Sequence, residues 1–81
     1  MQKIKVLLRQ KGIPASTPRI CIYNFLLSQK THPSAEMVFS ALHPQMPALS
    51  RTTVYNTLRM LCEIGLVKQI PICEGDMRFD A

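Results

Sequence analysis

Hydrophobic and polar residues between positions 49 and 67 (LSRTTVYNTLRMLCEIGLV) follow the period of an α-helix with two unlike faces. The apolar residues recur four and three positions apart, so they form one stripe that can face a core. These residues are Val54, Leu58 and Leu61. Ser50 is a favourable N-cap, and Gly65 is a favourable stop because glycine tolerates the left-handed conformation just past a helix end. The pattern therefore predicts a helix over residues 50–64.

The opposite face of this predicted helix is polar. Its residues are Thr52, Tyr55, Asn56 and Arg59. Arg51 adds a second cation at the start of the helix, and the one acid on this face, Glu63, lies at the far end. Arginine, asparagine and threonine side chains carry donors and acceptors that match base edges in a DNA major groove. The face is therefore suited to reading DNA, although the helix alone leaves a merely solvated surface as the alternative.

Three shorter helices are predicted upstream. Residues 2–11 place apolar side chains inward and basic ones outward, at helical spacing. A second helix follows a cap at Ser16 or Thr17; it is almost entirely apolar over residues 20–27, so we expect other helices to surround it. A third helix begins at Ser34.

After the predicted helix 50–64 the pattern becomes extended. LVKQIPI and MRFDA are typical of two strands, and CEGD between them is typical of a turn, which together predict a β-hairpin over about residues 66–81. Pro71 places at least part of its strand at a sheet edge. Three packed helices, a capped polar helix and a hairpin predict a winged helix-turn-helix, a mainly α fold with a small β-hairpin. Helix 50–64 is then the recognition helix and the hairpin is the wing.

Length and composition indicate one small globular domain. The chain has 81 residues, of which 47% are hydrophobic, a fraction too high for a disordered chain. No apolar run approaches the roughly 18 residues of a membrane span, and the start lacks a signal-peptide pattern, so we expect a cytoplasmic protein without a membrane partner. The three cysteines are odd in number and widely separated, which favours buried free thiols over a disulfide framework or a zinc clasp. They are Cys21, Cys62 and Cys73.

Charge is distributed unevenly along the chain. The formal net charge is +5, and residues 1–35 contain lysines and arginines but no aspartate or glutamate. A basic region beside a polar helix favours an anionic partner, most simply nucleic acid, whereas solubility alone does not require one sign over this length. Arg19 lies at the start of the second predicted helix, whose N-terminal N–H groups can also bind phosphate.

Three segments resemble one known family. HPSAEMVFSAL, then LSRTTVYNTLRMLCEIGLV, then a wing that contains RFD are similar to the N-terminal DNA-binding domain of the ferric uptake regulator (Fur) family of metal-dependent bacterial transcription repressors. The resemblance covers about residues 10–81. The asparagine after the tyrosine and the RFD of the wing are more similar to the peroxide-sensing branch than to the iron-sensing branch.

The resemblance implies roles for the polar face. Tyr55 and Asn56 would face bases, while Thr52 and Arg59 would lie near the DNA backbone. Two departures from the iron-responsive branch argue against its operator specificity. The basic residue that often precedes the second helix there is Pro14 here, and the arginine that often follows the recognition tyrosine is Asn56.

The resemblance also implies a metal site. His32 and Asp80 match two ligands of the regulatory site in full-length members, and such donors accept iron, manganese or zinc. Two ligands cannot complete a four-coordinate site, so we expect no tightly bound metal in residues 1–81. The other ligands come from a C-terminal dimerisation domain that this sequence lacks. We therefore expect a single DNA-binding domain that is monomeric alone, and a metal-binding homodimer in an intact protein.

The leading hypothesis is sequence-specific binding of double-stranded DNA by the reader domain of a metal-responsive repressor. A winged helix that serves as a protein-interaction module is the alternative, and it would need an apolar exposed face on helix 50–64. An enzyme is disfavoured, because the sequence has no glycine-rich phosphate loop and no nucleophile motif.

Overall fold

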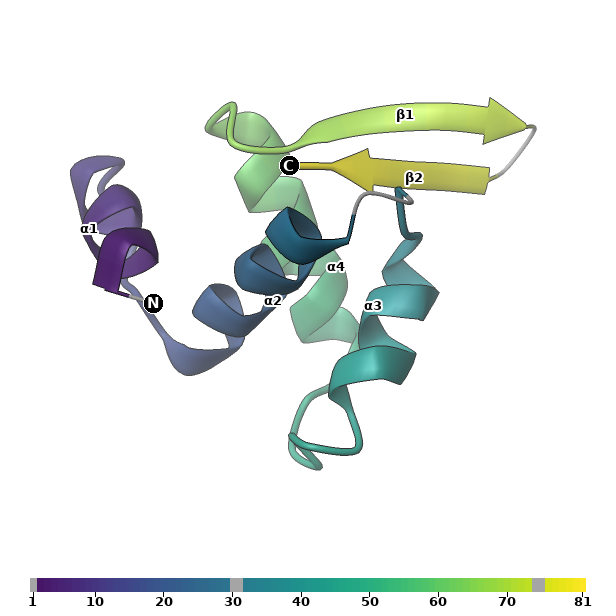
Figure 1. Ribbon diagram of the computed structural model, residues 1–81, viewed down its shortest axis with the longest axis horizontal. Coiled ribbons are helices and arrows are strands. Elements are labelled where there is room, and N and C mark those ends of the chain that lie inside the picture. Colours follow the sequence, from purple (N-terminus) through teal and green to yellow (C-terminus); the bar gives the residue numbers. More distant parts are fainter. Residues whose placement is uncertain (1, 30–31, 74–75) are drawn as a thin grey trace.

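The computed structural model describes residues 2–29, 32–73 and 76–81. Its elements are α1 (Gln2–Gln10), α2 (Thr17–Ser28), α3 (Ala35–Leu42), α4 (Arg51–Glu63), β1 (Lys68–Cys73) and β2 (Asp76–Asp80). In Figure 1, α2 crosses in front of α4, and α3 stands beside them. The hairpin lies across one end of these helices, and α1 lies next to α2 on the side away from α3. This is the predicted mainly α fold, a winged helix-turn-helix.

Serine caps begin three of the helices, as the sequence predicts. The Ser50 hydroxyl accepts a hydrogen bond from the Thr53 N–H at 3.1 Å, and the Ser34 hydroxyl accepts one from the Met37 N–H at 3.3 Å. Ser16 occupies the N-cap position of α2, but its side chain makes no capping hydrogen bond. Two of the three caps therefore satisfy an otherwise orphaned backbone donor.

One apolar core joins the helices to the hairpin. Its buried side chains include Ile4, Leu8, Ile20, Ile22, Leu26, Val38, Val54, Leu58, Leu61, Val67 and Phe79. Val54, Leu58 and Leu61 form the predicted inner stripe of α4. Thr57 is buried beside them, which the pattern did not predict. The second helix is less enclosed than expected, because Leu27 is 46% exposed.

The turn from α4 into the wing depends on Gly65. This residue has φ +82°, a left-handed conformation that costs glycine little. The Leu66 N–H then donates to the Leu61 carbonyl at 3.0 Å, which closes the end of the helix. The predicted stop at Gly65 is confirmed, and it sends the chain back over the helical body.

The wing is an antiparallel two-stranded sheet. Gln69 lies opposite Phe79 in its register, and the pairing shifts between Pro71 and Cys73. Because the sheet has two strands, each strand has one open edge. This arrangement suits Pro71, which has no N–H to donate to a neighbouring strand. The predicted turn includes residues 74 and 75, which lie outside the described residues. Phe79 fixes the wing to the body, since its side chain enters the core and its N–H donates to the Pro33 carbonyl at 3.1 Å.

None of the described helices has the length and apolar character needed to cross a membrane.

Candidate nucleic-acid interface

The polar face of α4 is open to solvent. Tyr55 is 51% exposed, and the other predicted reading residues are exposed as well. These are Thr52, Asn56 and Arg59. Helical spacing therefore assigned the two faces of α4 correctly, and the polar face forms a ridge.

A groove lies between this ridge and the start of α2. Its volume is about 510 Å³, and its lining is Ser16, Pro18, Arg19, Thr53, Asn56, Thr57 and Met60. Arg19 is the one cation of this lining, and no carboxylate contributes to it. Its Nη1 donates to the Pro14 carbonyl at 2.9 Å, which holds the guanidinium near the groove. We call this hollow the α2 groove.

A second groove lies between the ridge and the wing. It consists of two adjoining hollows of about 460 and 430 Å³ that share Tyr55, Gln69 and Phe79. Their other lining residues are Arg59, Cys62, Glu63, Ser34, Ala35, Glu36 and Met77. We call these hollows together the wing groove. The ridge of α4 is thus flanked on both sides, and each groove contains an arginine.

The two arginines of α4 differ in their surroundings. Within the described part of the chain, Arg59 forms no ion pair, with Glu63 or with another acid. The Arg51 Nε, by contrast, lies 2.6 Å from Oε1 and 3.2 Å from Oε2 of Glu36. The Arg51 guanidinium also lies 4.5 Å from the ring centroid of Phe39. No pattern in the sequence indicates this contact, because it joins α3 to α4 through the tertiary fold.

Burial affects one thiol in the wing groove. Partial burial raises the pKa of the Cys62 thiol, and the neighbouring Glu63 carboxylate raises the pKa further. A neutral thiol is a poor nucleophile and a poor metal ligand. Cys21 and Cys62 are free thiols, as predicted, but each is half-buried and not buried as expected. The side chain of Cys73 lies outside those described.

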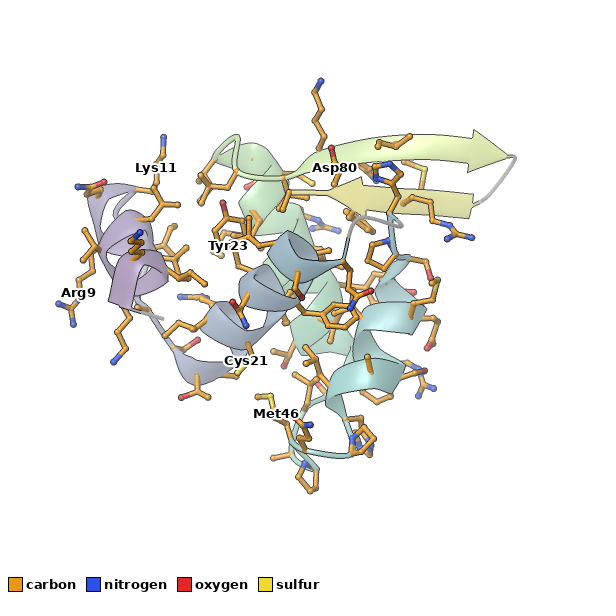
Figure 2. The ribbon with its side chains drawn as sticks, viewed as in Figure 1. Arg9, Lys11, Cys21, Tyr23, Met46 and Asp80 are labelled. Carbon is orange, nitrogen blue, oxygen red and sulfur yellow. The ribbon has the colours of Figure 1, made fainter. Side chains whose placement is uncertain are left out.

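Further basic residues lie at the end of α1 and directly after it. Figure 2 shows Arg9 and Lys11 extending away from the helical body, and both are exposed. Neither lines a groove beside α4. Arg9 and Lys11 therefore add general positive charge outside the α4 ridge and its two grooves.

The two residues implied as metal ligands lie together. His32 Nδ1 is 3.6 Å from Asp80 Oδ1, although one precedes α3 and the other ends β2 (Figure 2 labels Asp80). Nδ1 is buried and has no hydrogen-bond partner, and the His32 backbone has φ +56°, which is uncommon for a residue with a Cβ. Protein ligands lie about 2.0–2.2 Å from a bound transition metal, so both atoms could reach one ion. Among the described residues no third His, Cys, Asp or Glu completes a cluster with them.

A helical body, an exposed polar helix and a two-stranded wing define a winged-helix domain of the kind found in DNA-binding proteins. A model of the ferric uptake regulator family matches residues 10–81, and the chain belongs to this family. The resemblance inferred from the sequence is confirmed.

Two relatives identified by sequence are peroxide-responsive repressors. Over 73 residues the chain is 40% identical to PerR of Staphylococcus saprophyticus and 41% identical to PerR of Staphylococcus aureus. Each match covers 90% of this chain and 49% of the relative, so the chain spans about half the length of the curated relatives it matches. The predicted similarity to the peroxide-sensing branch agrees with these matches.

Solved structures agree with the fold. PerR from Streptococcus pyogenes superposes with a TM-score of 0.88 at 30% identity, over 96% of this chain and 54% of that one. The ferric uptake regulator of Pseudomonas aeruginosa, solved with manganese, superposes with a TM-score of 0.84 at 31% identity, over 94% of this chain and 57% of that one.

Proposed function

We propose that this chain binds double-stranded DNA sequence-specifically, as the reader domain of a metal-responsive bacterial transcriptional repressor. One observation carries the proposal: the exposed polar ridge of α4 lies between two grooves that each contain an arginine. A DNA major groove is about 12 Å wide and admits one α-helix, with a phosphate backbone on either side. The ridge and its two grooves match that shape.

The residues of the ridge would contact different parts of the DNA. The Asn56 amide can pair with an adenine edge, and the Tyr55 ring can pack on a thymine methyl group. Arg59 can donate to a guanine edge or to a phosphate, and Thr52 can reach the backbone. Arg19 lies across the α2 groove and would contact the phosphate backbone on that side of α4, while the opposite DNA strand would lie along the wing groove. The net charge of +5 supports such contacts at longer range.

The same domain would contribute two ligands to a regulatory metal site. His32 and Asp80 fit this role, because an orphaned imidazole nitrogen lies beside a carboxylate. Iron, manganese or zinc accepts such donors, and the remaining ligands must come from outside this pair. An ion held by both residues would tie the wing to the start of α3. In an intact homodimer, such a link would bias the two readers toward one DNA-competent arrangement.

The alternative, a protein-interaction module, has less support. It needs an exposed apolar face on α4, and Tyr55 is the one large hydrophobic side chain that α4 exposes. A catalytic function has no support, since the two PerR relatives are repressors.

Selection from a random-sequence duplex library tests the proposal directly. The 81-residue chain is expected to enrich a defined half-site and to bind it at least about tenfold more tightly than unselected DNA, since each base-reading contact contributes about 1–3 kcal/mol. Failure to enrich any sequence would contradict the proposal.

A further inference from the structure

We infer that Glu36 is a positioning residue for DNA recognition: together with Phe39 it holds the Arg51 guanidinium in the orientation in which it donates to a DNA phosphate. This inference rests on the proposed function and adds to it a residue of the neighbouring helix α3. It also gives an acidic side chain a favourable role in binding a polyanion.

Two residues of α3 contact the guanidinium from different directions. The Glu36 carboxylate accepts from Nε at 2.6 and 3.2 Å, along one edge of the planar group. The Phe39 ring lies against its face, with the Arg51 Cζ 4.5 Å from the ring centroid. Phe39 is itself in contact with the His43 ring, at 4.8 Å between centroids. An edge contact and a face contact together restrict a side chain that otherwise has many rotamers.

The outer edge of the guanidinium is left available. Within the described residues, neither Nη atom of Arg51 has a hydrogen-bond partner, and the side chain is 63% exposed. An arginine can pair with a carboxylate through one edge and with a phosphate through another, because its donors form a planar fork. The pair with Glu36 therefore leaves Arg51 able to bind DNA.

Arg51 lies in line with the proposed reading residues. Arg51, Tyr55 and Arg59 follow one another at intervals of four along α4, so they form one row on a single side of the helix. Glu36 and Tyr55 both line the wing groove. The contact thus fixes the first cation of this row at the edge of the groove where we place one DNA strand.

The direction in which DNA affinity changes when Glu36 is removed distinguishes a positioning role from simple charge repulsion. A carboxylate near DNA repels phosphate, so its simple removal should strengthen binding to every duplex. If Glu36 orients Arg51, its removal should instead weaken binding to the selected sequence. Glu63 provides the matched control, because it lines the same groove and has no cation partner in the described structure.

The experiment compares Glu36→Ala with Glu63→Ala. Affinity is measured by fluorescence anisotropy for the duplex that the unmodified chain selects and for an unselected duplex. Glu36→Ala is expected to lower affinity for the selected duplex about threefold to tenfold, and to have no such effect in an Arg51→Ala background. Glu63→Ala is expected to raise affinity for both duplexes slightly. Thermal unfolding should change little in either variant, because exposed ion pairs add little stability.

The affinity of these variants supports or overturns the positioning role of Glu36. Glu36→Ala that strengthens binding as Glu63→Ala does, or that leaves the affinity unchanged, overturns the positioning role. The positioning role is also overturned if Glu36→Ala lowers affinity equally in the Arg51→Ala background. If the unmodified chain selects no sequence, the proposed function fails first and this inference fails with it. If the chain does select a sequence, a negative result with Glu36→Ala counts against this inference alone.

Discussion

His32 Nδ1 and Asp80 Oδ1 lie 3.6 Å apart and so connect the segment before α3 to the end of the wing. Both atoms are suitable metal donors, but two ligands do not hold an ion tightly. We therefore predict that manganese or zinc leaves the DNA affinity of the 81-residue chain unchanged. Calorimetry should detect no tight stoichiometric binding. Tight binding that is lost in His32→Ala would contradict this prediction.

The backbone of His32 supports a second prediction. Its φ of +56° is strained for any residue with a Cβ, and glycine removes that strain. We expect His32→Gly to be more stable to urea than His32→Ala by about 1 kcal/mol. Ala48→Gly is the control, since Ala48 is exposed and has no positive φ; there glycine should destabilise the fold. A His32→Gly variant less stable than His32→Ala would show that the position carries no strain.

Several features of the fold could be predicted from the sequence because they are local. The helix periodicity separated the buried stripe of α4 from its exposed face, and Ser34, Ser50 and Gly65 marked helix ends through their own backbone chemistry. The change of period after Gly65 predicted the wing. The fold class follows from the order of these elements.

The rest depends on residues that only the tertiary fold brings together. The pairing of Arg51 with Glu36 links two helices, and no spacing within one helix indicates it. The possible pairing of Arg59 with Glu63, which spacing does permit, is absent from the described structure. His32 and Asp80 were matched through the family resemblance, since residues so far apart give no local signal.

The Cys62 thiol gives a pH-dependent prediction. Its raised pKa keeps the thiol protonated at neutral pH, so alkylation by iodoacetamide should be slow there and accelerate only in alkaline solution. Glu63→Gln removes the carboxylate that contributes to this shift and should speed alkylation at a given pH. Site-resolved mass spectrometry measures the rate. Equal rates at Cys62 in the two proteins would show that Glu63 does not influence the thiol.

The described surface predicts that the 81-residue chain is a monomer. Its exposed large hydrophobic side chains come from five different elements; Tyr55 and Met77 line the wing groove, whereas Val6, Leu27 and Met37 line neither groove. A stable dimer buries about 1,200 Å² or more, and a monomer lacks the gain in affinity that two tethered readers provide. Sedimentation should show one species of monomer mass at micromolar concentration, and a stable dimer would favour the interaction-module alternative.

The dependence of binding on salt, compared between arginine variants, shows whether the α4 ridge reads DNA. The measurement is the affinity of the unmodified chain, Arg59→Ala and Arg9→Ala for the selected duplex over a series of salt concentrations. Arg9 is the matched control because it is exposed on α1 and lines neither groove. We predict that binding weakens steeply with salt and that Arg59→Ala costs about 1–3 kcal/mol, whereas Arg9→Ala has a much smaller effect. Binding that does not depend on salt, or equal affinities for all three proteins, would show that the α4 ridge does not read DNA.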